Sequence, residues 1–258
     1  MTDATCCPRC GNTSPGVGRS GLCPSCLLAL ALGIEEGPEA DGHVNGLAPV
    51  YRVLTILASE PDRTMYLAEQ EEPRRLVTLD VVRVGPAPGV EDSDRLGERS
   101  RALRSWNHPG VPRVIDGRTT PSGDFCVVTQ YASGPSLDRY CETHRLDGQR
   151  RARLFAQVCE TVTDGHRHGV CHGRLRPDMV VAAGTRDEVV PLILGYSIVP
   201  DRVPTIEEDI SGLEHLARAM GWQGPSGRQW DSVDSVLAAA SVDWPAALAA
   251  ESNERTRG

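Results

Sequence analysis

The order of local patterns along residues 49–168 is the strongest constraint on the fold. Short β-branched and apolar runs, separated by Pro, Gly and charged turns, predict strands at 51–57, 64–69, 76–84, 111–116 and 124–131. Apolar residues at helical spacing predict helices at 92–106, 136–144 and 149–168. A strand-rich half followed by a helix-rich half indicates an α+β domain of two lobes with a cleft between them.

The chain of 258 residues contains no lysine, because all 27 of its basic side chains are arginine. This excludes chemistry that depends on an ε-amine, such as a Schiff base or a P-loop lysine on a phosphate. With 35 acidic side chains the formal charge is −8, which does not suit a general binder of nucleic acid. No apolar run approaches the roughly 20 residues of a membrane span. The N-terminus lacks the features of a secretion signal, so we expect a cytoplasmic protein without a membrane partner.

A pair of cysteine knuckles near the N-terminus predicts a structural zinc site. The pattern C-x2-C-x12-C-x2-C is formed by Cys7, Cys10, Cys23 and Cys26. Four thiolates at this spacing can hold one tetrahedral zinc ion, and a filled coordination sphere leaves no open position for catalysis. The alternative is that these cysteines serve redox chemistry or cluster by chance. The adjacent Cys6 is out of register, and we expect it to be a spare or alternative ligand.

Composition divides the chain into four parts. Residues 1–33 contain the zinc ribbon and a short helix that ends at Gly33. Residues 34–48 are rich in Glu, Gly, Pro and Asp, which is typical of a linker. We expect a strand-rich N-lobe over residues 49–132 and a helical C-lobe over residues 133–258.

Several strings in the larger domain resemble the Ser/Thr protein kinase family, in particular its bacterial members. Residues 172–177, H-G-R-L-R-P, follow a long helix and resemble the catalytic loop H-R-D-L-K-P-x-N. Residues 107–111, N-H-P-G-V, resemble the N-H-P-N-I that closes the αC helix. Residues 130–137, Q-Y-A-S-G-P-S-L, resemble the hinge, which puts Thr129 at the gatekeeper position. Residues 209–213, D-I-S-G-L, resemble the start of the αF helix.

The resemblance covers roughly residues 50–220 and implies a two-lobed protein-kinase-like fold, preceded here by the zinc ribbon. That order of domains is also typical of bacterial kinases. Only about ten residues, 199–208, stand where the family has a much longer activation segment, so the C-lobe is truncated. Residues 58–63 align with the glycine-rich loop over the phosphates, but they contain no glycine and carry two carboxylates that would repel a triphosphate.

The positions of the family's catalytic residues are also changed. Relative to the family, the base aspartate becomes Arg174, the following lysine Arg176 and the metal-binding asparagine Met179. The metal-binding aspartate aligns with Gly195, or with Leu194 after a shift of one residue. Without these parts the resemblance implies a pseudokinase, because phosphoryl transfer needs them together.

In the family, a lysine on the third strand pairs with a glutamate on αC. Asp80 aligns with the lysine and Arg99 with the glutamate, although a one-residue slip would place Glu98 there. The exchanged charges suggest a reversed ion pair that holds αC inward. The alternative is that Asp80 and Arg99 are two independent surface residues. His172 matches the family's structural histidine, and we expect no second metal among the histidines at 166, 168 and 172.

The sequence therefore predicts a cytoplasmic bacterial pseudokinase that acts as a non-catalytic interaction or regulatory module. Its expected partner is a protein, such as an active kinase or another component of the same pathway. Productive ATP binding is not expected, and Arg9 and Arg19 alone give little support for nucleic-acid binding by the ribbon. The alternative is a nucleotide-binding protein or an enzyme with non-standard nucleotide chemistry in the degenerate cleft.

Overall fold

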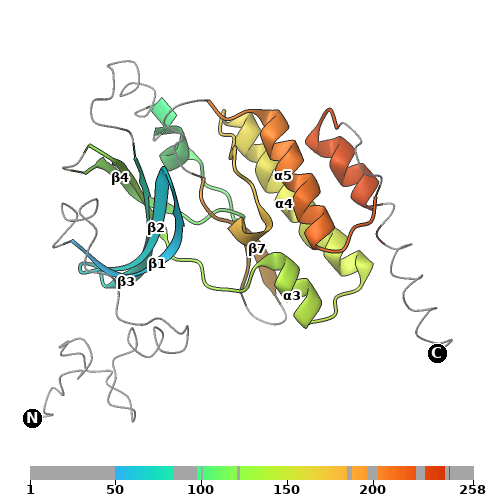
Figure 1. Cartoon of the computed structure of the whole chain (residues 1–258), viewed down its shortest axis with the longest axis horizontal. Coiled ribbons are helices and arrows are strands. Elements are labelled where there is room, and N and C mark those ends of the chain that lie inside the picture. The colour runs from blue at the N-terminus through green and yellow to red at the C-terminus, as the bar shows by residue number, and fades with distance from the viewer. Residues whose placement is uncertain are drawn as a thin grey trace, which may run out of the picture.

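The chain forms two lobes, one built on a five-stranded sheet and the other on helices (Figure 1). The computed structural model describes residues 50–83, 98–99, 101–120, 123–184, 188–196, 203–224, 230–241 and 244. The predicted zinc ligands and the linker lie outside these residues. The two-lobed α+β architecture predicted from the sequence is confirmed.

The sheet is antiparallel, with its strands in the order β1-β2-β3-β5-β4. The strands are β1 (Tyr51–Glu60), β2 (Arg63–Gln70), β3 (Arg75–Val82), β4 (Val114–Thr119) and β5 (Phe125–Gln130). All five lie where short β-branched and apolar runs predicted them, with ends that differ by a few residues. Every residue of β2 is buried, including the charged Arg63 and Glu69.

The connection between β1 and β2 is tighter than the sequence suggested. We expected residues 58–63 to form a loop, but β1 and β2 pair up to Glu60 and Arg63. Only Pro61 and Asp62 remain as the turn. Arg63 is therefore part of a buried strand and not of a solvated loop.

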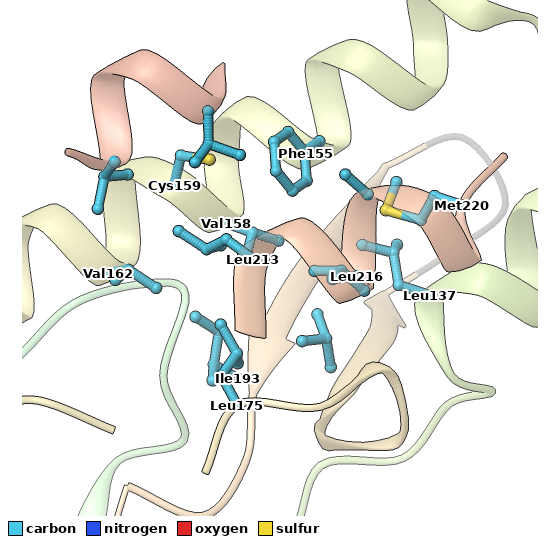
Figure 2. Close-up of a cluster of buried hydrophobic side chains, with 14 of the residues drawn as sticks. Leu137, Phe155, Val158, Cys159, Val162, Leu175, Ile193, Leu213, Leu216 and Met220 are labelled. Carbon is cyan, nitrogen blue, oxygen red and sulfur yellow. The ribbon is translucent and has the colours of Figure 1, made fainter. Parts of the chain in front are cut away.

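The helical lobe is organised around two packed helices. Its elements are α3 (Leu137–Thr143), α4 (Gly148–Arg167), the short 3-10 helix η2 (Pro177–Met179), β6 (Val180–Gly184), β7 (Val189–Ile193) and α5 (Ile206–Ala219). Phe155, Val158 and Val162 of α4 belong to one apolar cluster with Leu213 and Leu216 of α5 (Figure 2). Burial of this stripe is what stabilises the two helices against each other.

Side-chain caps define the ends of both helices. The Asp147 carboxylate accepts a hydrogen bond from the backbone N–H of Arg150 at the start of α4. Thr205 and Glu208 form a reciprocal capping box at the start of α5. Among the helices that the structure describes, none has the length and apolar character to cross a membrane.

Candidate functional site

The cleft between the lobes contains the residues that the sequence aligned with kinase catalytic positions. The structure brings Asp80 and Gly195 together through one side chain, Arg63. It places Arg174 and Arg176 against the β1–β2 turn. These contacts join the two lobes across the mouth and the interior of the cleft.

Arg63 and Asp80 form a buried ion pair. The guanidinium donates from Nε to Oδ1 of Asp80 at 2.6 Å and from Nη2 to Oδ2 at 2.5 Å. The side chains are only 6% and 5% exposed, so water does not screen the pair. Burial lowers the pKa of Arg63, but the charge and hydrogen bonds of Asp80 outweigh it, and the net pKa is raised. Asp80 thus neutralises a buried arginine.

The same guanidinium also reaches the segment after β7. Nη2 of Arg63 donates to the carbonyl oxygen of Gly195 at 3.0 Å. Gly195 has a φ of +80°, and a Cβ at this residue would lie 2.6 Å from Nη2 of Arg63. A side chain at Gly195 would therefore adopt a strained backbone conformation and would have to displace the Arg63 guanidinium.

The predicted pair between Asp80 and Arg99 is wrong. Both carboxylate oxygens of Asp80 accept hydrogen bonds from Arg63, whereas Arg99 donates to the carbonyl oxygen of Cys171 at 2.5 Å. The alternative of two independent surface residues is also wrong, because Asp80 is only 4% exposed. Antiparallel pairing of β2 with β3 sets Met65 opposite Asp80, which leaves Arg63 on the same face at diagonal distance.

A second group of charges closes the outer part of the cleft. Arg174 donates to Oε2 of Glu60 at 2.8 Å and to both carboxylate oxygens of Asp62, in one case at 2.9 Å. Arg176 donates to the other oxygen of Glu60 and also pairs with Asp178 at 3.1 Å. Glu60 therefore bridges the two arginines, and Arg174 bridges Glu60 and Asp62.

Glu60, at the end of β1, and Asp62, in the turn, are both held in their charged forms. Burial raises the pKa of Glu60, but hydrogen bonds and charge from Arg176 and Arg174 outweigh it and lower the net pKa. A hydrogen bond from Arg174 is the largest influence on Asp62 and lowers its pKa. The carboxylates that the sequence predicted to repel phosphate are thus engaged with the cations of the loop at 172–176.

The loop at 172–176 is anchored by Asp209 on α5. Asp209 is fully buried and accepts hydrogen bonds from the backbone N–H groups of His172 at 2.8 Å and Gly173 at 2.6 Å. It also lies 2.8 Å from Nε2 of His166. Burial raises the pKa of Asp209, but these hydrogen bonds outweigh it and lower the net pKa, which keeps the carboxylate ionised. The rigid loop presents Arg174 to the turn.

His172 is a structural residue, as the sequence predicted. Its Nε2 lies 2.8 Å from the carbonyl oxygen of Leu194, and its Nδ1 accepts a hydrogen bond from the backbone N–H of Arg174. The ring packs edge-on against Tyr196 with 4.8 Å between centroids. Burial lowers the pKa of His172 to about 4, so the imidazole is neutral at pH 7.

Met179 lies in η2 and is 4% exposed. Its backbone N–H donates to Arg176 and its carbonyl accepts from Leu194, so its place in the fold is fixed by main-chain bonds. A thioether on a buried side chain is a poor ligand for a hard divalent cation. Neither Met179 nor Gly195 offers the oxygen ligand that magnesium requires.

A small apolar pocket remains behind the ion pair. It lies between β3, β5 and the segment after β7, and Thr78, Thr129 and Gly195 are among the residues that line it. Asp80 is the one acidic side chain among the described residues that line it. Its volume of about 20 Å³ holds little more than one water molecule. The pocket is too small for a nucleotide base.

His166, Cys171 and Asp209 place potential metal-ligating atoms within 4.8 Å of one another. His166 and Asp209 are already hydrogen bonded, and Asp209 receives two loop amides. Burial, followed by the charge of Asp209, raises the pKa of the Cys171 thiol and disfavours the thiolate that binds metals. Hydrogen bonding within the fold accounts for this cluster.

The sequence missed the residues that pair with the predicted positions. Arg63 was assigned to a loop, and the acids at Glu60 and Asp62 were interpreted only as repelling phosphate. The sequence does show opposite charges in the two segments, because residues 60–62 carry two acids and the loop at 172–176 carries two arginines. Only the antiparallel register of β2 and β3, however, reveals Arg63 as the partner of Asp80.

Comparison with known proteins supports the fold. The chain is 25% identical over 153 residues to the Ser/Thr protein kinase pkn3 of Myxococcus xanthus, which covers 58% of this chain and 28% of that protein. It is 25% identical over 139 residues to calcium/calmodulin-dependent protein kinase type 1 of Macrobrachium nipponense, and this match covers 54% of this chain and 40% of that protein. The chain thus spans less than half the length of these relatives. No family model matches it.

Solved structures agree. The Mycobacterium tuberculosis PknI kinase domain, in a single-residue mutant form, superposes with a TM-score of 0.54 at 16% identity, over 81% of this chain and 96% of that one. A Rad53 1–466 structure in complex with AMP-PNP superposes with a TM-score of 0.54 at 14% identity, over 75% of this chain and 53% of that one. The fold of residues in both lobes is therefore that of a protein kinase, of the kind found in bacterial Ser/Thr kinases.

Proposed function

We propose that this protein is a catalytically inactive, protein-kinase-like module that acts by binding another protein. The observation that carries the proposal is the triple contact of Arg63 with Asp80 and the Gly195 carbonyl, which fills the interior of the cleft with the chain's own charges. A nucleoside triphosphate would have to displace this buried, bidentate ion pair to enter the space between the lobes.

The chemistry of phosphoryl transfer argues in the same direction. A triphosphate needs a cation and bound metal ions near its phosphates, together with a base or orienting group for the acceptor. Asp80 adds negative charge on the third strand, and Arg174 cannot accept a proton at neutral pH because a guanidinium stays protonated. Gly195 and Met179 supply no carboxylate or amide for magnesium.

The second candidate is a nucleotide-binding protein with non-standard chemistry. Its support is that Arg174 and Arg176 are cations at the mouth of a kinase-like cleft. Both guanidiniums, however, already pair with Glu60, so binding would first have to break those contacts. The non-catalytic role is the simpler explanation of the arrangement.

A thermal-shift titration separates the two candidates. ATP at 10 mM, with magnesium or manganese, would reveal even a Kd of about 0.1 mM, because a hundredfold excess over Kd stabilises a protein by about 2.7 kcal/mol. We expect no saturable shift beyond that caused by sodium sulfate at equal ionic strength. Saturable stabilisation by the metal–ATP complex would favour the second candidate.

The proposal extends to the N-terminal cysteines, which would hold one structural zinc ion through Cys7, Cys10, Cys23 and Cys26. A small ribbon tethered by a linker is suited to present a binding surface beside the two lobes. Its partner would be an active kinase or another protein of the same pathway. Cross-linking from the bacterial host with the full chain, compared with a Cys10→Ser/Cys26→Ser variant, would show whether capture of a partner depends on the ribbon.

A further inference from the structure

We propose that Glu60, Asp62, Arg174 and Arg176 form a salt-sensitive clasp that holds the two lobes closed without a ligand. The acids belong to the hairpin of β1 and β2, and the arginines belong to the loop that Asp209 anchors on α5. The inference goes beyond the proposed function, because it concerns how the cleft is closed and stands whether or not a partner protein binds.

The clasp connects parts of the chain that are far apart in sequence. Glu60 and Arg174 are 114 residues apart, Asp62 and Arg174 are 112 apart, and Glu60 and Arg176 are 116 apart. Each contact joins the sheet lobe to the helical lobe. Main-chain connectivity does not impose these contacts, so they report how the lobes are positioned.

The four side chains form a network and not isolated pairs. Glu60 contacts both arginines through different oxygens, and Arg174 contacts both acids through its two terminal nitrogens. Bidentate arginine–carboxylate geometry gives such contacts orientation as well as energy. A network of this kind contributes more than a single surface ion pair, which is often worth almost nothing.

Exposure distinguishes this outer clasp from the inner contact of Arg63. The outer side chains are 21% to 41% exposed, whereas Arg63 and Asp80 are 6% and 5% exposed. Dissolved salt screens partly exposed charges much more than buried ones. The outer clasp should therefore loosen as salt rises, while the inner ion pair keeps the hairpin and Gly195 in contact.

A matched control is present in the chain itself. Asp178 pairs with Arg176 at 3.1 Å, but it lies only two residues away and in the same lobe. Asp178→Asn removes one charge from the same arginine without touching a contact between the lobes. Glu60→Gln/Asp62→Asn removes the acids that do cross the cleft.

The test is hydrogen exchange measured by mass spectrometry on the full chain. In Glu60→Gln/Asp62→Asn we expect exchange to rise about tenfold in peptides covering 58–65 and 172–178, with β7 and α4 unchanged and Asp178→Asn like the native protein. The native protein should show the same paired rise between 0.05 M and 1 M sodium chloride, which tests the clasp without a mutation.

Unchanged exchange in both peptides, in the variant and at high salt, would overturn the proposal. A rise in only one of the two peptides would also overturn it, because a clasp must release both sides together. A rise spread evenly over both lobes would show that these side chains stabilise the whole fold and not the closure of the cleft, which is likewise contrary to the proposal. ATP binding has no part in these readouts, so they are independent of the thermal-shift result.

Discussion

Arg63 and Asp80 lie at diagonal positions on neighbouring strands and share two hydrogen bonds, at 2.6 and 2.5 Å, in the interior of the cleft. The pair is a contact inside the sheet, between β2 and β3, and not the contact between a strand and a helix that the sequence predicted. It also extends to the helical lobe, because the same guanidinium donates to the Gly195 carbonyl. One arginine thus contacts two of the positions, Asp80 and Gly195, that the sequence aligned with kinase catalytic residues.

Removing one partner of this pair should be strongly destabilising. Arg63→Met or Asp80→Asn leaves the other group buried without its counter-charge, and we expect each to lower the free energy of unfolding by about 3–5 kcal/mol. The double variant should cost less than the sum, with a coupling energy of about 1–3 kcal/mol measured by urea denaturation.

The matching cycle between Arg99 and Asp80 is the control. Arg99 donates to the Cys171 carbonyl and not to Asp80, so its coupling with Asp80 should be near zero. Equal coupling energies in the two cycles, or additive effects of Arg63 and Asp80, would contradict the assignment of partners.

Gly195→Ala tests whether Arg63 excludes a side chain at this position. We expect a loss of about 2–4 kcal/mol, since an L-residue at positive φ costs about 1–2 kcal/mol and the new Cβ would lie 2.6 Å from the guanidinium. Gly123→Ala is the matched control, because Gly123 has a φ of +89° and nothing within 4 Å of a Cβ. Chemical denaturation should therefore show a clearly larger loss for Gly195→Ala. Similar losses for the two variants would show that Arg63 does not restrict the site.

The sequence predicted β1 to β5, α3 and α4 because the signals of these elements are local. The β-branched and apolar run along 64–69 and the apolar stripe along 149–168 each reflect burial of residues within a single element. The proposed loss of catalytic residues likewise rests on single positions, since the lack of a carboxylate at Gly195 needs no partner to be recognised. The partner of each charged side chain depends on neighbours in space, and the predicted partner of Asp80 was wrong for this reason.

Asp80 illustrates the difference. The sequence alignment places Asp80 where the family has a lysine and predicts Arg99 on the following helix as its partner. The partner comes from β2 because a two-residue turn continues the strand to Arg63, and pairing with β3 then places it beside Asp80. A polar residue at the end of a strand gives no sequence signal that it points inward.

The N-terminal cysteines predict one zinc ion per chain. Elemental analysis of the purified full chain should find about one equivalent of zinc, and Cys10→Ser should abolish stable binding because three thiolates and an open position hold the ion less tightly. Cys6→Ser should retain the metal, because Cys6 is out of register with the knuckles. Loss of zinc in Cys6→Ser with retention in Cys10→Ser would reverse the assignment of ligands.

His172 predicts how stability depends on pH. Its pKa is about 4 in the folded chain and 6.5 in a solvated reference, so the unfolded chain takes up a proton that the folded chain does not bind. The resulting stability is complete above pH 6.5 and falls as the pH drops towards 4, by about 3 kcal/mol over the whole interval. The structural reason is that the ring has no site for a second proton, because Nδ1 accepts the N–H of Arg174.

This dependence can be measured by urea denaturation between pH 7 and pH 5. The paired acids Glu60 and Asp62 titrate below this range. Burial raises the pKa of Glu60, but Arg176 and Arg174 outweigh it and lower the net pKa, and hydrogen bonding to Arg174 is the main influence that lowers the pKa of Asp62. His172→Gln should be less stable at pH 7 but should lose less stability on acidification. His144→Gln, at an exposed histidine, is the control for a His-to-Gln substitution as such. In nuclear magnetic resonance spectra the ring of His172 should not titrate between pH 7 and pH 5. A midpoint near 6.5 for His172 would show that the loop at 172–176 is open to solvent and would contradict the structure of the site.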